Sequence, residues 1–344
     1  MKLFIHLGFP RTGTHTLRFH LWKKHPQINY LGRIQRGPGE NHLELTELIS
    51  KLNNDDFDKR YNELLKKAGE IKLISNKTNL ISDECLWAYA FKDSKKGDKY
   101  KTLSRFVSRM NLLFSKIKVD VNFIYTIRNQ SDIIKSQYSR SAPEVGGSFA
   151  FNGETLVQYL KTNRANQPII ESYLSGLKYF ELFKNISDVI GKNKVCFFLY
   201  EKLWFDNNKT LYDLSNYLKI DPNISIKLLK DKREDRFNTW FEEKLRYNTV
   251  GSIIFNKLKK NLKNRDIFFE NFAKKLLRMF KLMFVGVFKY NSQHKKNTKK
   301  TKDALNNQLN IIADNKTLIK KYYRYDCLAL KKECGLDIDK YNYL

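Results

Sequence analysis

Residues 3–17, with the sequence LFIHLGFPRTGTHTL, constrain the fold of this chain of 344 residues more than any other segment. The apolar run 3–7 predicts a buried strand, residues 8–13 predict a loop with two glycines, and a helix is expected to begin near Thr14. A strand that runs through such a loop into a helix is the geometry that holds a phosphate group, because the loop N–H groups and the positive end of the helix dipole point at the anion. We therefore predict a phosphate site here.

The loop departs from the nucleotide-hydrolase pattern G-x-x-x-x-G-K-[ST]. Gly8 and Gly13 keep the glycine spacing, but Thr14 stands at the lysine position and His15 at the position of the hydroxyl that binds Mg²⁺. The cation comes earlier, at Arg11. Such a loop is poorly suited to Mg·ATP hydrolysis, but it still suits a 5′-phosphate with a cation above it. The predicted binding residues are Pro10, Arg11, Thr12, Gly13, Thr14, His15 and Thr16.

Composition and charge narrow the class of protein. The formal net charge of +28 favours anionic partners: a phosphorylated cofactor, an acidic glycan, nucleic acid or an anionic membrane. The four cysteines show neither a C-x-x-C pair nor metal-ligand spacing, so free thiols in a reducing compartment are expected. The N-terminal residues predict a strand rather than a signal peptide, and the apolar run 282–288 is too short to span a bilayer. We expect a cytoplasmic protein, with contact to the inner membrane face left open.

Alternating strand and helix patterns predict an α/β fold of the P-loop type, with a mostly parallel central sheet between two layers of helices. Strands are expected at residues 3–7, 71–75, 80–82, 121–127 and 195–199. Helices are expected at residues 14–24, 57–68, 101–116, 131–140, 155–163, 169–190, 210–218 and 304–333. The last of these ends before Gly335, a plausible C-cap.

Residues 251–302 differ in character, with 15 Lys/Arg against two acids. Aromatic and leucine residues recur there at helical spacing, which predicts basic amphipathic helices followed by a flexible loop. The expected domain therefore comprises 1–240 and 303–344, with 241–302 inserted in it. Two interpretations stay open: the apolar stripe packs on the core with its lysines solvated, or it docks on an anionic membrane or a polyanionic substrate.

A second strand that runs into a helix occupies residues 121–132. Arg128 stands where this strand ends, Asn129 can cap the next helix, and Ser136 follows Arg128 by eight residues. Taken alone, such an arginine is more often a surface ion-pair partner and such a serine a solvated helical residue. Together with the first loop, the pair predicts a nucleotide that carries both a 5′-phosphate and a separate 3′-phosphate.

These motifs resemble those of sulfotransferases that use 3′-phosphoadenosine 5′-phosphosulfate (PAPS). Residues 8–17 are similar to the 5′-phosphosulfate loop of that family, and Arg128 with Ser136 resembles its 3′-phosphate motif. The ending 314–344 resembles the close of bacterial members, many of which act on glycans. The resemblance covers residues 1 to about 240 and 303–344, and leaves 251–302 uncovered. Arg11 replaces the commoner lysine, as in some carbohydrate-directed members.

The resemblance implies sulfuryl transfer from PAPS to a hydroxyl of a carbohydrate or glycolipid, with no metal. Arg11 would stabilise the bridging oxygen as its bond to sulfur breaks. The base would be Glu84, in a segment similar to the bacterial Ser-x-Glu, while Asp83 and Glu84 could instead cap a helix and His15 is the rival base.

A late basic loop closes over the 3′-phosphate in sulfotransferases, and Lys232 or Arg233 could do so here, although a solvated charge cluster is an equal alternative. Two other classes of protein compete with the enzyme. A P-loop kinase is disfavoured by the missing lysine and by the lack of an evident Mg²⁺-binding acid after a strand. A nucleic-acid-binding protein fits the charge, but no recognition motif is present and no nucleic-acid partner is expected.

Overall fold

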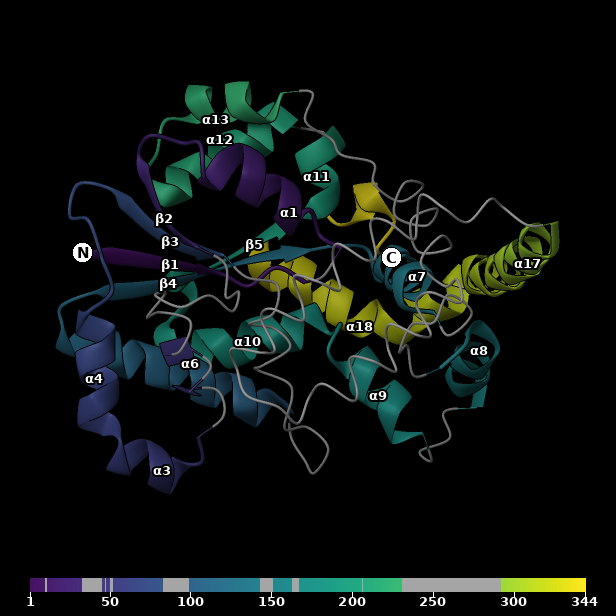
Figure 1. Cartoon of the computed structure of the whole chain (residues 1–344), viewed down its shortest axis with the longest axis horizontal. Helices are drawn as coiled ribbons and strands as arrows, with labels where there is room; N and C mark the ends of the chain where they lie inside the picture. Colours follow the sequence, from purple (N-terminus) through teal and green to yellow (C-terminus); the bar gives the residue numbers. More distant parts are fainter. Residues whose placement is uncertain are drawn as a thin grey trace. The chain divides into compact units, whose positions relative to one another are not determined.

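The structure is a computed structural model that describes residues 1–9, 11–32, 45–46, 48–49, 52–82, 99–142, 151–162, 167–205, 207–230 and 292–344 (Figure 1). The chain divides into two compact units. The first unit comprises Met1–Ile134, Tyr159–Glu234 and Lys316–Leu344. The second comprises Lys135–Gln158 and Asp235–Asn315. Each unit is described below by itself.

A five-stranded parallel sheet forms the centre of the first unit and confirms the predicted α/β class. The strands lie in the order β2-β3-β1-β4-β5, so the N-terminal strand is central. Their bounds are β1 Lys2–His6, β2 Ile28–Gly32, β3 Thr78–Ser82, β4 Asp120–Ile127 and β5 Val195–Leu199. Because every pair is parallel, the residues that follow the strands are delivered to one edge of the sheet.

One strand prediction is wrong and one strand was missed. Residues 71–75 form no strand, because the side chain of Asn79 holds this stretch in a turn by accepting from Ile74 N–H (2.8 Å) and donating to the Ile74 carbonyl (3.1 Å). The missed strand is β2, at the edge of the sheet. It carries Asn29 and Tyr30 among its part-buried residues, so it lacks the apolar run that marks a central strand.

Helices cover both faces of this sheet (Figure 1). The helical segment after β1 lies on one face with α12 (Asn207–Leu218) and α13 (Pro222–Leu229). The other face carries α4 (Tyr61–Gly69), α6 (Lys99–Lys116) and α10 (Tyr179–Ile190). The remaining helices of the first unit include α3 (Asn54–Lys59), α9 (Pro168–Ser175), α11 (Tyr200–Phe205) and α18 (Lys316–Cys334).

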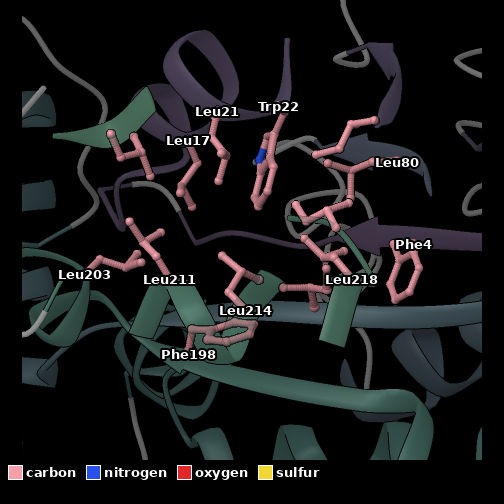
Figure 2. Close-up of a cluster of buried hydrophobic side chains, with 14 residues drawn as sticks. Phe4, Leu17, Leu21, Trp22, Leu80, Phe198, Leu203, Leu211, Leu214 and Leu218 are labelled. Atoms are coloured by element: carbon pink, nitrogen blue, oxygen red, sulfur yellow. The ribbon is translucent and has the colours of Figure 1, made fainter. Parts of the chain in front are cut away.

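The helix after β1 contains π-helical turns that were not predicted. Thr14–Thr16 is α-helical, Leu17–Trp22 is π-helical, and Lys23 N–H donates to the Arg18 carbonyl across five residues (3.2 Å). The wider turn places residues four and five apart on nearly the same face. Three side chains of this helix accordingly point into one core cluster with Phe4, Phe198 and the leucines of α12, namely Leu17, Leu21 and Trp22 (Figure 2). Burial of each stabilises the fold by about 1.5–3 kcal/mol.

Three predicted helices are interrupted. Residues 57–68 are divided between α3 and α4, and 169–190 between α9 and α10. The segment predicted as 304–333 belongs to α17 (Ser292–Asp314) and α18, with Asn315 between them. Helix α17 also includes residues 292–302, whose basic end we expected to be a loop. Gly335 follows α18 with φ +64°, and its N–H donates to the Lys331 carbonyl (3.0 Å), as predicted for a C-cap.

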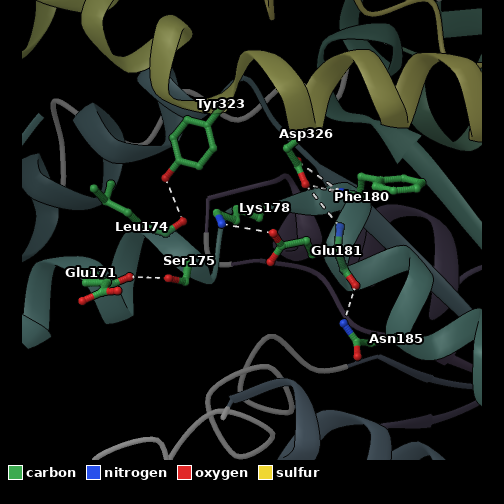
Figure 3. A network of polar contacts seen from close by, with 9 residues as sticks. All are labelled: Glu171, Leu174, Ser175, Lys178, Phe180, Glu181, Asn185, Tyr323 and Asp326. Carbon is green, nitrogen blue, oxygen red and sulfur yellow. Dashed lines mark hydrogen bonds and ion pairs between the residues drawn. The ribbon is translucent and has the colours of Figure 1, made fainter. Parts of the chain in front are cut away.

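Helix α18 anchors α9 and α10 through polar contacts (Figure 3). The Asp326 carboxylate accepts the N–H groups of Phe180 (3.1 Å) and Glu181 (3.2 Å) at the N-terminus of α10. Tyr323 donates its hydroxyl to the Leu174 carbonyl at the end of α9 (2.8 Å). Burial raises the pKa of Asp326 to about 6, although these backbone donors oppose the shift. The contacts fix the helix that leads to the C-terminal residues 339–344.

In the second unit, α8 (Gly153–Thr162) packs closely on α17. Gly153 N–H donates to Gln308 Oε1 (2.9 Å), and a Cβ at Gly153 would lie 2.8 Å from the Gln308 carbonyl oxygen. Glycine is therefore required at this contact. Within the described residues, no helix is long and apolar enough to cross a membrane.

Candidate functional site

The loop after β1 is shaped by a close backbone approach at Gly8. A Cβ on Gly8 would lie 2.1 Å from Thr14 Oγ1 and 3.2 Å from His6 Cε1. No side chain fits between the loop and the start of the helix. The first glycine of the motif is therefore explained by packing against Thr14, a residue predicted to bind phosphate.

The loop then turns through two residues with positive φ, Arg11 at +76° and Gly13 at +77°. Between them, Thr12 directs both its N–H (3.2 Å) and its hydroxyl (2.6 Å) to the Phe9 carbonyl. Positive φ is unfavourable for arginine by about 1–2 kcal/mol, and such strain is typical of residues held for function. Arg11 is partly exposed, whereas Thr12 and Thr14 are buried.

The helix begins directly after this turn. The bond from Leu17 N–H to the Gly13 carbonyl (3.0 Å) closes the first helical turn. Helix geometry leaves the N–H groups that precede it directed out of the helix end, where an anion is stabilised. Thr16 is buried and His15 is partly exposed on the same turn. Pro10 lies outside the described residues.

Arg128 lies against this loop, although 117 residues separate it from Arg11. Its Nη1 donates to the Arg11 carbonyl (3.0 Å), and its guanidinium lies over the Tyr200 ring, 4.6 Å from the centroid. Tyr179 donates its hydroxyl to the Arg128 carbonyl (2.7 Å). The Arg128 Nε is buried and has no hydrogen-bond partner among the residues that the structure describes. An arginine held in place with an unsatisfied donor is suited to receive an anion.

Asn129 supports Arg128 from the next position. Its side-chain oxygen accepts the N–H (3.0 Å) and hydroxyl (2.6 Å) of Ser131. Asn129 therefore caps α7 (Gln130–Ser141), as predicted. Its side-chain nitrogen donates to the carbonyls of Tyr341 (3.3 Å) and Asn342 (2.6 Å). The C-terminal residues are thereby joined to the end of β4.

A buried carboxylate, Glu201, completes this arrangement and was missed by the sequence reasoning. Its Oε1 accepts Asn129 N–H (2.8 Å), and its Oε2 accepts the Tyr343 hydroxyl (3.0 Å). Burial raises the pKa of Glu201, while these two donors and the charge of Arg128 act in the opposite direction. An acid two residues after the buried strand β5 was the available signal, but its partners lie far away in the sequence.

His6, at the carboxyl end of β1, is a buried packing residue. The buried imidazole pairs through Nδ1 with Ser82 Oγ (2.8 Å) and through Nε2 with Thr126 Oγ1 (2.9 Å). Burial lowers the pKa of His6 to about 3, so the ring is neutral near pH 7. It links the ends of β3 and β4 to β1 beneath the loop. His6 also pairs in register with Ser82 on the neighbouring strand.

The other predicted site residues are Ser136, Glu84, Asp83, Lys232 and Arg233. Ser136 is on α7, as expected, in the part of that helix that belongs to the second unit. Glu84, Asp83, Lys232 and Arg233 lie outside the described residues. Among the described residues, no group of three or more His, Cys, Asp or Glu side chains could hold a metal ion.

No protein-family model and no curated protein sequence matches the chain. Among solved structures, the chain is similar to a sulfotransferase from Alicyclobacillus acidocaldarius, with 16% identity, 71% of this chain and 90% of that chain covered, and a TM-score of 0.42. It is also similar to the mouse sulfotransferase SULT7A1 complexed with PAP, with 16% identity and a TM-score of 0.35. That match covers 82% of this chain and 88% of the mouse chain. Since both TM-scores lie below 0.5, we infer function from the residues of this chain.

Proposed function

We propose that the chain is a sulfotransferase that transfers a sulfuryl group from PAPS to a hydroxyl of a carbohydrate or glycolipid. One observation carries the proposal: Arg128 Nη1 donates to the Arg11 carbonyl at 3.0 Å. This contact joins the two segments predicted to bind the 5′- and 3′-phosphates of one nucleotide. They leave the adjacent parallel strands β1 and β4 at the same edge of the sheet.

The residues present fit such a donor. The loop residues Arg11 to Thr16 would hold the 5′-phosphate end through backbone N–H groups and hydroxyls, as the positive φ values at Arg11 and Gly13 support. Arg128, with its unsatisfied buried Nε, would hold the 3′-phosphate. We propose that Ser136 and a basic residue at 232–233 assist it. When bound, the donor would supply the sulfuryl group.

The chemistry asked of the protein is positioning and charge stabilisation. Arg11 would neutralise negative charge on the departing bisphosphate, and its carbonyl is already fixed by Arg128. We propose Glu84 as the base that takes the proton of the acceptor hydroxyl. It follows β3 by two residues, and β3 ends at Ser82, which is paired with His6 (2.8 Å). His15 and Asp83 remain the alternative bases.

Isothermal titration of the full chain would test the donor assignment, with adenosine 3′,5′-bisphosphate, adenosine 5′-phosphate and ATP, each with and without Mg²⁺. We expect the bisphosphate to bind roughly 10–100-fold more tightly than the monophosphate, because a charged hydrogen-bonding group contributes about 1.5–3 kcal/mol. Its affinity should not depend on Mg²⁺. Equal affinities for the two adenosine phosphates would contradict the proposal, and tight Mg²⁺-dependent ATP binding would favour a kinase.

The proposed acceptor class is supported by the net charge of +28 and by the resemblance of the C-terminal segment to glycan-directed enzymes. Transfer of labelled sulfate from PAPS to a panel of glycans and glycolipids would identify the acceptor. We propose that the basic segment 251–302 mediates any contact with anionic membrane at the cytoplasmic face. Co-sedimentation with vesicles of anionic and of neutral lipid would test that contact.

A further inference from the structure

Arg18, on the helix that follows the loop, is a buried cation. The residue is only 5% exposed, and its Nη1 has no hydrogen-bond partner among the residues that the structure describes. In the described part of the chain, Arg18 takes part in no ion pair. Burying a charge is costly unless an opposite charge accompanies it. The proposed donor phosphates do not require Arg18, because Arg11 and Arg128 stand at the two phosphate positions.

The Arg18 guanidinium lies just beneath the surface, against an exposed aromatic ring. Its central carbon is 4.8 Å from the centroid of Phe19, a residue that is 38% exposed. Lys23 Nζ lies 4.8 Å from the same centroid and 5.9 Å from that of Tyr30. The centroid of the His15 ring is 4.4 Å from that of Phe19. An exposed ring with two cations thus adjoins the loop where transfer is proposed.

The position along the helix favours the acceptor over the donor. A rise of about 1.5 Å per residue places the Cα of Arg18 about 6 Å beyond that of Thr14. Its guanidinium carbon lies over the Phe19 ring, and Nζ of Lys23, the residue after the helix, lies over the same ring. The two cations therefore converge on Phe19 instead of on the phosphate turn.

We infer that Arg18, Phe19 and Lys23 form a binding site for an acidic group of the acceptor saccharide, a carboxylate or a sulfate on a sugar next to the one that is modified. The guanidinium edge would pair with the acid, and the Phe19 ring would pack on the apolar face of the sugar. This inference rests on the proposed function and adds that the acceptor is an anionic glycan. A nucleic acid is disfavoured because one aromatic ring offers no succession of stacking platforms.

The test uses the full chain saturated with adenosine 3′,5′-bisphosphate and titrated with two matched pairs: oligogalacturonate and its methyl ester, and dextran sulfate and dextran. We compare wild type with Arg18→Gln and with Lys66→Gln, which removes an exposed charge on α4 at the opposite face of the sheet. Arg18→Gln should weaken binding of at least one acidic saccharide by 10-fold or more, and Lys66→Gln by less than 2-fold. Equal losses in both variants, or no preference of wild type for either acidic saccharide, would overturn the inference.

Two further measurements separate the possible failures. If the Arg18 charge is there to bind a ligand, Arg18→Met without ligand should have a melting temperature equal to or above that of wild type. The acidic saccharide should then raise the melting temperature of wild type but not that of Arg18→Met. A lower melting temperature with unchanged saccharide affinity would make Arg18 structural. Arg18→Gln should leave the bisphosphate affinity within 2-fold. Failure of wild type to bind the bisphosphate would instead refute the proposed function. If Arg18→Gln weakened the binding of a single-stranded DNA oligonucleotide as much as that of the acidic saccharide, the surface would be a general polyanion site and the inference would be refuted.

Discussion

The loop after β1 and the surroundings of Arg128 lie side by side but are built differently. The loop takes its form from a single stretch of chain, in which Gly8 makes room for Thr14 and two residues adopt positive φ. Arg128 is held instead by groups distant in sequence, including the Tyr179 hydroxyl and the ring of Tyr200. The proposed nucleotide site thus combines one half that a single stretch of chain determines with another half that depends on the completed fold.

This difference has a consequence for mutations. A substitution in the loop acts at the site directly, because the residues that shape the loop are also those proposed to bind. A substitution near Arg128 is expected to act through the residues that hold it, such as Glu201, which accepts from Asn129 N–H and from the Tyr343 hydroxyl. Variants can therefore distinguish residues that act in sulfuryl transfer, residues that bind the nucleotide and residues that only hold Arg128 in place.

The largest effect is expected for Arg11→Ala. Turnover should fall by roughly 10²–10³-fold, because a group that stabilises charge in the transition state is lost. The melting temperature should change little, since alanine meets the same positive φ. Steady-state transfer rates with PAPS would be compared with those of Arg11→Lys, which should retain much of the activity. Near-normal turnover of the alanine variant would remove Arg11 from the mechanism.

Arg128→Ala should raise the dissociation constant of adenosine 3′,5′-bisphosphate by about 10–100-fold. The constant for adenosine 5′-phosphate should change much less, because that ligand is held by the loop. Titration calorimetry measures both, with Lys59→Ala at the exposed end of α3 as the control. If the affinities for the two nucleotides fell equally, Arg128 would support the loop through the Arg11 carbonyl and would not bind the 3′-phosphate.

His6 lies beneath both halves and should make stability depend on pH. Its pKa is about 3 in the folded chain but near 6.5 in an unfolded one, so the unfolded chain binds one more proton between these values. The His6 contribution is complete above pH 6.5 and is lost as the pH falls below it. From pH 7.5 to 5, wild type should lose about 2 kcal/mol that His6→Gln does not lose. Denaturant unfolding at both pH values measures this, and equal pH dependence in the two proteins would contradict it.

The smallest effect is expected for Tyr343→Phe, which removes the hydroxyl that binds Glu201 (3.0 Å). A single hydrogen bond contributes about 0.5–1.5 kcal/mol, so bisphosphate affinity should fall about 2–10-fold. Affinity for adenosine 5′-phosphate should stay unchanged, because the loop needs no C-terminal support. A parallel loss for both nucleotides would show that the two halves are not independent.

The same contrast explains what could be predicted from the sequence. Short segments of sequence were enough to predict the parallel α/β fold, the loop, the position of Arg128 after a strand and the Asn129 cap. In each case the residues that cause the feature are close together in the chain. The pairing of Glu201 with Tyr343 spans 142 residues, and that of His6 with Thr126 spans 120. No local pattern indicates such partners. The edge strand β2 was missed for a related reason, since β3 is its one partner among the described strands and four of its five residues are only partly buried.

The central place of β1 also affects how the chain must be synthesised. Leu3 pairs with Asn79 on one side and with Val121 on the other, so more than a hundred residues must be synthesised after β1 before both of its edges are covered. At about 5–20 residues per second, this synthesis takes from about 6 to more than 20 seconds. During this time at least one edge of the hydrophobic strand β1 is uncovered, which exposes the nascent chain to aggregation.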